Sequence, residues 1–425
     1  MLIVFQVVAF LILSAVSYTV IVLAISVGRR ERCRIKAYEK SLEHLERRFA
    51  DEVQLRQVRK RRDELTWQGY RKLEVRKKEL LDKSGICALE LAPRGGQPLP
   101  PYKPGQFLTF KLVIGREKQT VVRCYSLADC YRAEENCYRI VVKKVLRPTT
   151  KPDVPDGLVS SYFYDNVREG ELLDVRAPAG NFVLDSSRDA PVVLVAGGIG
   201  ITPLWSMLNE IVRRNSARDT WLFYGVRHGG ERIFREKLAR IRSSHENVNV
   251  RICYSSPREG DRKGTDYDHE GRITIEYLKQ EIPTHEFEYY ICGPPPMMST
   301  LTKGLKAWGV LPSSIRTEAF CTPARELSKT SMRTIDAQHA QGVEVSFAKS
   351  ERTIRWDSEA NNLLEFARAN GISMESGCEA GSCGECKVAV RKGEVDYISE
   401  PGLDCEIDCC LTCIAVPREN VVLEA

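Results

Sequence analysis

The pattern of apolar and charged positions divides the chain into stretches of different character. Residues 1–28 contain no charged side chain, and an apolar run of this length can cross the roughly 30 Å hydrocarbon core as one helix. A cleaved signal peptide would have a basic start and a shorter apolar core. Four arginines follow at once, Arg29, Arg30, Arg32 and Arg34, and positive charge at this end of a span is typical of the cytoplasmic side. The sequence therefore predicts a permanent single-pass anchor in the inner (cytoplasmic) membrane, with the catalytic domains in the cytoplasm.

Residues 29–66 have the pattern of a charged helical stalk. Apolar side chains recur at alternating gaps of three and four, at Ile35, Tyr38, Leu42, Leu45 and Phe49. Two heptads do not decide between a solvated helix, packing near the membrane surface and a two-chain coiled coil. A homodimer through the stalk therefore stays open. The arginines at its start can hold anionic headgroups, which makes membrane lipid an expected partner.

Beyond Trp67 the helical period gives way to alternation. Residues 72–80 and 86–91 look like strands, and short strands with frequent turn signals continue to about residue 185. This spacing is typical of a small antiparallel barrel. We therefore assign residues 67–187 to one β domain.

From residue 188 the pattern is that of an α/β sheet. Residues 191–195 form a continuous apolar run, which fits a strand buried on both faces. Similar strands recur at 221–225, 248–253 and 289–292, with helical segments between them. This alternation predicts a doubly wound parallel sheet over 188–322, in which ligands bind beyond the carboxyl ends of the strands.

The remaining sequence predicts a linker and a small third domain. Residues 323–340 lack periodicity and have the composition of a linker. Alternation over 343–347 and 352–356 predicts a hairpin, and a helical pattern follows over 362–370. We expect an α+β domain over residues 341–425.

Composition and charge fit a multidomain protein of a reducing compartment. The 425 residues exceed one ordinary core. The fifteen cysteines are scattered, apart from those near residue 380 and between 405 and 413, which favours one metal centre over a disulfide scaffold. Residues 341–425 hold sixteen acidic against eight basic residues. Such a domain could dock on a basic partner surface, and the alternative is a solvated acidic face.

Three cysteines gather near the carboxyl end at offsets of five and three, namely Cys378, Cys383 and Cys386, and Cys413 follows further along. This is the spacing of a plant-type 2Fe–2S loop. The glycines between them permit a backbone that wraps closely around a cluster and offers N–H donors to its sulfurs. A zinc ribbon would show two separate Cys-x-x-Cys pairs instead. The sequence therefore predicts an iron–sulfur cluster.

Motifs in the two middle domains resemble those of the ferredoxin–NADP reductase superfamily. The β domain carries Arg-Cys-Tyr-Ser over 123–126 and Gly-Leu-Val-Ser over 157–160. The α/β domain carries Gly-Gly-Ile-Gly-Ile-Thr-Pro over 197–203, Tyr-Gly-Val-Arg over 224–227 and Cys-Gly-Pro-Pro-Pro-Met over 292–297. The resemblance implies a flavin-binding barrel followed by a nicotinamide domain.

The resemblance also assigns roles to single residues. Arg123 would neutralise the flavin phosphate, the Tyr125 ring would lie on the isoalloxazine face, and the Ser126 hydroxyl would contact N5, the atom that takes the hydride. Cys292 would lie close to the hydride-bearing carbon and shape the pocket, and the alternative is a buried core cysteine. The other implied cofactor contacts are Gly157, Val159 and Ser160 for the flavin phosphate, Gly197, Gly198, Gly200, Thr202, Pro203, Arg227 and Gly293 for the nucleotide, and Phe320 beside the flavin.

The last domain resembles a whole plant-type ferredoxin, which implies a β-grasp fold. Its ending Leu-Thr-Cys-Ile-Ala-Val over 411–416 matches the family's ligand-then-strand ending. The implied ligands are therefore Cys378, Cys383, Cys386 and Cys413. Cys405, Cys409 and Cys410 stay open as alternatives for the fourth ligand, with Cys410 the runner-up.

This domain order implies a converter of hydride into single electrons. NADH or NADPH would donate, with NADH favoured by the proline between Ser256 and Arg258, and the electrons would pass through FAD, or FMN as the alternative, to the 2Fe–2S cluster. The six histidines form no His/carboxylate iron motif, so we expect the substrate chemistry in a partner. We expect a reductase for an oxygenase, hydroxylase or desaturase, soluble or membrane-bound. The alternatives are a respiratory-type NADH dehydrogenase component that reduces quinone, and a redox sensor or scaffold. We expect no nucleic-acid partner.

Overall fold

The computed structural model divides into two compact units, residues 1–61 and 62–425. Residues 56–65 are helical, and the heptad seam predicted upstream of them lies outside the described residues. Among the residues described, no helix is both long and apolar enough to cross a membrane; the predicted anchor lies outside them apart from Ser14. The described residues are 14, 53, 56–81, 85–115, 118–146, 156–186, 188–214, 216–320, 342–357, 360–377, 379, 381, 384–398, 401 and 408–425.

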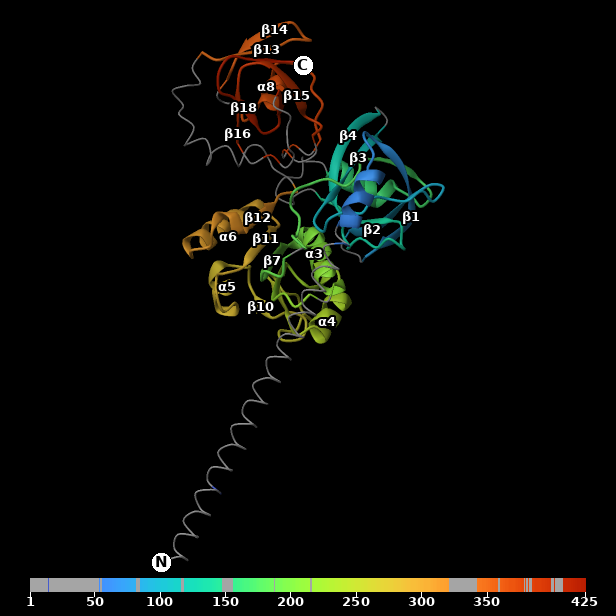
Figure 1. Ribbon diagram of the computed structural model, residues 1–425, viewed down its shortest axis with the longest axis vertical. Coiled ribbons are helices and arrows are strands. Elements are labelled where there is room, and N and C mark those ends of the chain that lie inside the picture. The colour runs from blue at the N-terminus through green and yellow to red at the C-terminus, as the bar shows by residue number, and fades with distance from the viewer. Residues whose placement is uncertain are drawn as a thin grey trace, which may run out of the picture. The chain divides into compact units, whose positions relative to one another are not determined.

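The first domain of the second unit is a six-stranded antiparallel sheet with the order β4-β3-β6-β1-β2-β5 (Figure 1). Large apolar side chains fill it, among them the wholly buried Phe110, Tyr138 and Phe163. The predicted antiparallel barrel is therefore confirmed. Its elements are β1 (Arg71–Leu80), β2 (Ile86–Pro93), β3 (Phe107–Ile114), β4 (Gln119–Ser126), β5 (Tyr138–Lys143), the short helix α2 (Leu158–Ser161), a π turn (Tyr162–Asn166) and β6 (Leu172–Val175).

The second domain is a six-stranded parallel sheet with the order β10-β9-β8-β7-β11-β12. All six residues of β7 are buried, as the continuous apolar run predicts. The strands are β7 (Val192–Gly197), β8 (Thr220–Val226), β9 (Val248–Tyr254), β10 (His269–Glu270), β11 (Glu288–Cys292) and β12 (Ile315–Glu318). The helices are α3 (Ile201–Arg213), α4 (Arg235–Ser244), α5 (Ile275–Glu281) and α6 (Pro295–Ala307).

The helices of this sheet lie on both of its faces. Side chains of α3 and α4 share a core cluster with one face of the strands, and side chains of α5 and α6 share another with the opposite face (Figure 1). The strand order reverses between β7 and β11, which makes this the switch point where doubly wound sheets bind ligands. The first core cluster also contains Ile86, Ala88 and Val141 of the barrel. The barrel and the parallel sheet are therefore packed together.

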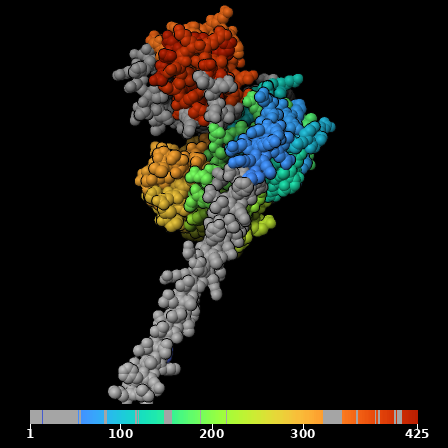
Figure 2. All heavy atoms as spheres, in the orientation of Figure 1, coloured from blue at the N-terminus to red at the C-terminus, as the bar shows by residue number. Residues whose placement is uncertain are grey.

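In its described residues, the third domain combines a five-stranded sheet, β14-β13-β19-β15-β17, with a β16–β18 pair and the helix α8. Asn362 caps the helix, since its side chain accepts a hydrogen bond from the Glu365 N–H at 2.8 Å. On the side shown in Figure 2 the domain, orange to red, forms one rounded body. The predicted hairpin and helix are confirmed, whereas the predicted linker lies outside the described residues. The elements are β13 (Glu344–Phe347), β14 (Arg352–Arg355), α8 (Leu363–Ala369), β15 (Lys387–Lys392), β16 (Val395–Tyr397), β17 (Cys409–Leu411), β18 (Ala415–Pro417) and β19 (Val421–Leu423).

Candidate redox site

Three strands end side by side at the switch point of the parallel sheet. Cys292, the last residue of β11, pairs in register with Ala196 of β7 on one side and with Glu318 of β12 on the other. The Ser126 hydroxyl, at the end of barrel strand β4, donates a hydrogen bond to Oε2 of Glu318 at 3.4 Å. The structure thus brings the two predicted catalytic residues, Ser126 and Cys292, to one place and adds a carboxylate that neighbours both.

Glu318 is a residue of this site that the sequence does not single out. Strand β12 is only four residues long, and none of its positions is buried. Its sequence, Ile-Arg-Thr-Glu, has a single apolar residue and therefore lacks the alternation of apolar and polar residues that identifies a strand from sequence. The sequence shows only a carboxylate near the end of the predicted nucleotide domain. Without the register of β12 against β11, that carboxylate does not indicate a site.

The Cys292 thiol is wholly buried in the core on one face of the sheet. Burial, and secondarily the charge of Glu318, raises the pKa of this thiol well above its ordinary value. The thiolate is the nucleophilic form of cysteine. A thiol held neutral in this way fits the predicted pocket-shaping role, and also the alternative of a core cysteine, but does not fit a nucleophile.

Three of the predicted glycines lie where two loops approach so closely that no side chain fits. A Cβ on Gly200 would lie 2.3 Å from the carbonyl oxygen of Cys292. A Cβ on Gly293 would lie 2.9 Å from the Cα of Gly197, and one on Gly197 would lie 2.9 Å from the sulfur of Met297. These glycines therefore allow the turn before α3 to pack against the loop after β11.

The start of α3 fits the binding of a diphosphate. Gly200 is its N-cap, no side chain caps the helix, and its first turn holds no acidic residue. A 3-10 turn (Gly198–Gly200) leads directly into α3 and takes up the Ile201 N–H, so the first backbone N–H groups without a side-chain cap are those of this turn, and such groups bind anions. Gly198 has a left-handed backbone (φ +56°) with open space around it. Thr202 and Pro203 are buried, and the Thr202 hydroxyl donates to the carbonyl of Ile199 at 3.1 Å. Because the Thr202 hydroxyl proton is already used in this hydrogen bond, the hydrogen bonds donated to the nucleotide would come from backbone N–H groups.

The predicted flavin face lies on β4. The Tyr125 ring is half-buried and packs edge-on against Phe110 and Phe163, with ring centres 5.8 and 4.9 Å apart. This packing fixes the ring while leaving part of its surface available, which fits stacking on an isoalloxazine. Arg123 is exposed, and one of its guanidinium nitrogens donates to the Val122 carbonyl at 2.7 Å. Its cationic end is therefore accessible to a phosphate.

The predicted phosphate segment forms the short helix α2. The Ser160 hydroxyl accepts from the Val145 N–H at 3.1 Å and donates to the Gly157 carbonyl at 3.0 Å, so it is engaged with backbone. Val159 is buried in the barrel core. By contrast, the Ser161 hydroxyl is buried and has no hydrogen-bond partner in the described part of the chain. Ser161 is therefore a further candidate for the flavin phosphate.

Two other predicted contacts lie at the margins of the domain. Arg227, whose side chain is 69% exposed, forms an ion pair with the buried carboxylate of Glu231. Lys143 of the barrel lies 3.5 Å from the same carboxylate. Arg227 is therefore held at the junction of two domains. Phe320 is 41% exposed, which leaves its ring available to a cofactor.

Two of the predicted cluster ligands face each other in the third domain. The sulfur atoms of Cys386 and Cys413 lie 3.1 Å apart, and each residue is only 2% exposed. The Gly381 N–H donates to the Cys413 sulfur at 3.3 Å, and its left-handed backbone (φ +72°) is one that glycine favours. The Thr412 hydroxyl donates to the Cys386 carbonyl at 3.0 Å, which ties the two segments together. Paired thiols with an N–H donor fit a 2Fe–2S cluster.

The other predicted ligands are only partly placed. Cys378, Cys383 and the alternative Cys405 lie outside the described residues. Within the described part, no group of three potential ligands is assembled. Cys409 and Cys410 sit on strand β17, paired with β15, and Cys410 is wholly buried in the domain core. The geometry supports Cys413, and the four-ligand set stays a prediction.

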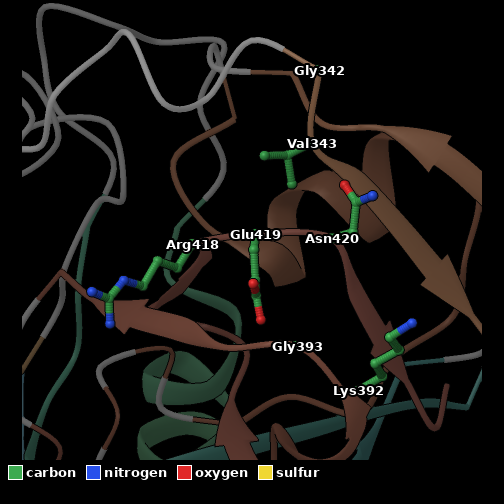
Figure 3. A pocket seen from close by; sticks show the side chains of 7 residues that line it. All are labelled: Gly342, Val343, Lys392, Gly393, Arg418, Glu419 and Asn420. Atoms are coloured by element: carbon green, nitrogen blue, oxygen red, sulfur yellow. The ribbon is translucent and has the colours of Figure 1, made fainter.

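A hollow of about 410 Å³ lies elsewhere on the third domain (Figure 3). It is lined by Gly342, Val343, Lys392, Gly393, Arg418, Glu419 and Asn420. None of these is a predicted site residue. Glu419 points into it, whereas the Arg418 side chain extends away from it and pairs with Glu394 at 3.0 Å. The hollow is therefore separate from the redox site.

Three family models match successive parts of the chain. Residues 91–184 match the oxidoreductase FAD-binding domain, residues 194–303 the oxidoreductase NAD-binding domain, and residues 345–418 the 2Fe-2S iron-sulfur cluster binding domain. These matches identify FAD as the flavin and place the three cofactor domains in the predicted order.

Known proteins share parts of this arrangement. A flavohemoprotein of Halalkalibacterium halodurans is 36% identical over 254 residues, which is 60% of each chain. The chain thus spans about three fifths of the length of such curated relatives. A type IV self-sufficient cytochrome P450 monooxygenase is 24% identical, with a TM-score of 0.60, over 84% of this chain and 41% of that one. Phthalate dioxygenase reductase is 24% identical, with a TM-score of 0.50, over 84% of this chain and 98% of that one.

The similarity to the two solved structures supports the fold alone, whereas the domain matches and the geometry of the site indicate which cofactors the chain uses. An uncapped helix end beyond a parallel sheet, a fixed tyrosine beside a serine and paired buried thiols fit a nicotinamide nucleotide, a flavin and a 2Fe–2S cluster respectively. The chain is an NAD(P)H-dependent oxidoreductase built from an FAD-binding, an NAD-binding and a 2Fe–2S domain.

Proposed function

We propose that this chain is a membrane-anchored reductase that passes electrons from NADH or NADPH, one at a time, to a partner oxygenase, hydroxylase or desaturase. The observation that carries the proposal is the presence on one chain of an FAD-binding, an NAD-binding and a 2Fe–2S domain, which together would carry electrons from nucleotide to flavin to cluster. The contact between Ser126 and Glu318 supports it, because it joins the flavin domain to the nucleotide domain where hydride would pass.

The chain's own residues would prepare this transfer. When bound, FAD supplies a two-electron acceptor and the 2Fe–2S cluster supplies a one-electron carrier. Ser126 is only 6% exposed, and its hydrogen bond to Glu318 fixes the direction in which its hydroxyl points. Cys292 adds a neutral side chain that is wholly buried and lies next to Glu318 in the sheet register.

The proposed acceptor is a second protein. The likeness in fold to phthalate dioxygenase reductase and to a P450 monooxygenase supports an oxygenase system. The acidic excess of residues 341–425 suits docking on a basic surface. We also propose NADH as the preferred donor, because Arg227 is engaged by Glu231 and not held ready for a 2′-phosphate.

The proposed location is the inner membrane. The support is the charge-free stretch of residues 1–28 and the arginines that follow it. Tethering would confine the reductase and a membrane-bound acceptor to two dimensions, which raises their effective concentration. A dimer through the stalk would follow from the heptad seam.

The full chain in native membranes tests this function. We expect NADH to drive the reduction of cytochrome c, and Cys413→Ser to abolish that activity while ferricyanide reduction persists. Washing with high salt should leave the activity in the membrane fraction. Quinone reduction that survives the Cys413→Ser substitution and is insensitive to added soluble acceptors would favour the respiratory alternative and contradict the proposal.

A further inference from the structure

The cluster loop is tied to the flavin barrel through one buried acidic side chain. Glu385 lies directly before the cluster ligand Cys386, and its side chain is only 7% exposed. Its Oε1 forms an ion pair with Arg176 at 2.6 Å and accepts a hydrogen bond from the Tyr70 hydroxyl at 3.0 Å. A carboxylate is costly to bury unless it is paired and hydrogen-bonded. Both of the partners that satisfy it come from the barrel.

The barrel presents these partners from neighbouring strands. Tyr70 precedes β1 and Arg176 follows β6, and these two strands are paired through Arg71 and Val175. The Arg176 guanidinium lies over the Tyr70 ring, 5.0 Å from its centre, and Lys111 of β3 lies 5.6 Å from the same ring. Since the sheet holds all three side chains, they form a preorganised receptor for one carboxylate.

A second contact joins the other end of the cluster loop to the barrel. Arg123 donates to the carbonyl of Gly377 at 3.4 Å, and Gly377 directly precedes the predicted ligand Cys378. Arg123 lies three residues before Ser126 on strand β4. The barrel therefore holds the predicted cluster loop near both of its ends, and one of these contacts comes from the strand that carries the flavin-side serine.

We propose that Arg176, Tyr70 and Glu385 form a docking latch that positions the cluster for electron transfer from the flavin. The inference rests on the proposed function. When FAD and the cluster are bound, one hydride would bring two electrons and one proton to the flavin site. The two electrons would pass singly to the cluster and on to two one-electron acceptor proteins, and the one proton would be released to solvent once both electrons have left.

The chemistry of the latch suits a contact that also has to open. The attraction within a buried ion pair is largely offset by the cost of removing its members from water, so such a pair adds specificity more than net stability. A released Glu385 regains its hydration, and the cluster domain becomes available to an external acceptor. Removing Arg176 alone leaves the Glu385 carboxylate without its countercharge, with only the Tyr70 hydroxyl to offset the cost of its burial, and this should shift the loop to the released state.

Anaerobic rapid mixing of the full-length holoenzyme with NADH separates reduction of the flavin by NADH from reduction of the cluster by the flavin. We expect Arg176→Ala to leave the rate of flavin bleaching unchanged and to slow the appearance of the reduced cluster by about tenfold or more. Arg176→Lys should recover part of that rate, since it keeps the charge. In the double variant Arg176→Ala/Glu385→Gln, cluster reduction should be no slower than in the slower single variant, because the two substitutions remove the same ion pair. Lys72→Ala, which breaks the surface pair with Asp174 on the same strands, is the matched control and should behave as wild type.

Hydrogen exchange on the same proteins provides a readout independent of turnover. We expect Arg176→Ala, but not Lys72→Ala, to speed amide exchange around residues 70 and 385. Wild-type cluster reduction and exchange rates in Arg176→Ala would overturn the latch. If neither NADH nor NADPH bleaches the flavin of the wild-type protein, the proposed function itself fails, whatever the latch variants do.

Discussion

The hydroxyl of Ser126 lies 3.4 Å from Oε2 of Glu318, although 192 positions separate the two residues in the chain. One ends a strand of the antiparallel barrel and the other ends the last strand of the parallel sheet. Their contact marks where the flavin-binding and nucleotide-binding domains meet. Cys292 lies next to Glu318 in the sheet register, so a neutral thiol, a carboxylate and a hydroxyl lie at one junction.

Removal of the Ser126 hydroxyl should slow hydride transfer. In Ser126→Ala we expect the rate of flavin reduction by NADH to fall by about 10- to 100-fold, because an oriented hydrogen-bonding group is lost beside the hydride acceptor. Stopped-flow absorbance measures this rate. Ser346→Ala removes an exposed hydroxyl paired with Thr353 in the third domain and should leave it unchanged. Equal rates in Ser126→Ala and wild type would remove the assigned role.

The two glycines that flank Ile199 should respond differently to the same substitution. Gly198→Ala has open space but a left-handed backbone, so we expect a loss of about 1–2 kcal/mol in unfolding free energy. Gly200→Ala would place a Cβ 2.3 Å from the Cys292 carbonyl oxygen, so we expect a larger loss, above about 3 kcal/mol, together with weakened NADH binding. Urea unfolding and NADH titration measure these effects. Equal losses would mean that the close loop contact does not constrain Gly200.

Alkaline pH should destabilise the nucleotide domain through buried thiols. Burial raises the pKa of Cys292 well above 9.0 and raises that of Cys253 to about 12. The folded state therefore keeps protons that the unfolded state loses. The stability from this effect is fully present below the unfolded pKa near 9 and declines as the pH rises toward the folded values.

Unfolding measured between about pH 7 and pH 10 checks this sign. We expect the free energy of unfolding to fall above about pH 9, by at most about 1.4 kcal/mol per pH unit for each thiol. Cys292→Ala should make the free energy of unfolding of the nucleotide domain fall less steeply with pH. Cys409→Ala, in the third domain, should leave that pH dependence unchanged. A stability that rises above pH 9 would contradict the assignment of Cys292 as a buried neutral thiol.

The fourth cluster ligand can be identified by substitution. We expect Cys413→Ser and Cys386→Ser to lose the cluster absorbance, because these sulfurs face each other at 3.1 Å. Cys409→Ser should keep it, since Cys409 lies on a paired strand. Cys410→Ser should also keep the cluster but lower stability, because it places a hydroxyl in the core. Iron and sulfide analysis measures how much cluster each variant holds per chain. An intact cluster in Cys413→Ser would mean that another residue is the fourth ligand.

Much of the fold could be predicted from local patterns. The buried run of β7 and the alternation in the barrel leave clear periodic signals, and Asn362 is a typical helix N-cap. Strand β10 was missed because two residues are too short to show a period, and strand β12 was missed because its sequence, Ile-Arg-Thr-Glu, has a single apolar residue, at its start. The motifs gave Ser126 and Cys292, since these follow recognisable local sequences.

The rest of the site depends on tertiary contacts that local sequence does not encode. Glu318 becomes a site residue only through the pairing of β12 with β11. The sequence also cannot show that the Ser160 hydroxyl is engaged with backbone while that of Ser161 has no partner among the described residues. Likewise, Glu385 resembles any polar residue in the cluster loop until Arg176 and Tyr70 are placed beside it.

The most direct test of the account is an anaerobic titration of the full-length protein with NADH, followed by flavin absorbance and by the electron paramagnetic resonance of the cluster. We expect the flavin to bleach and the reduced-cluster signal to appear. In Cys386→Ser the flavin should bleach without that signal. A flavin that neither NADH nor NADPH can reduce, or a cluster that stays oxidised beside a fully reduced flavin, would contradict electron flow from nucleotide to flavin to cluster.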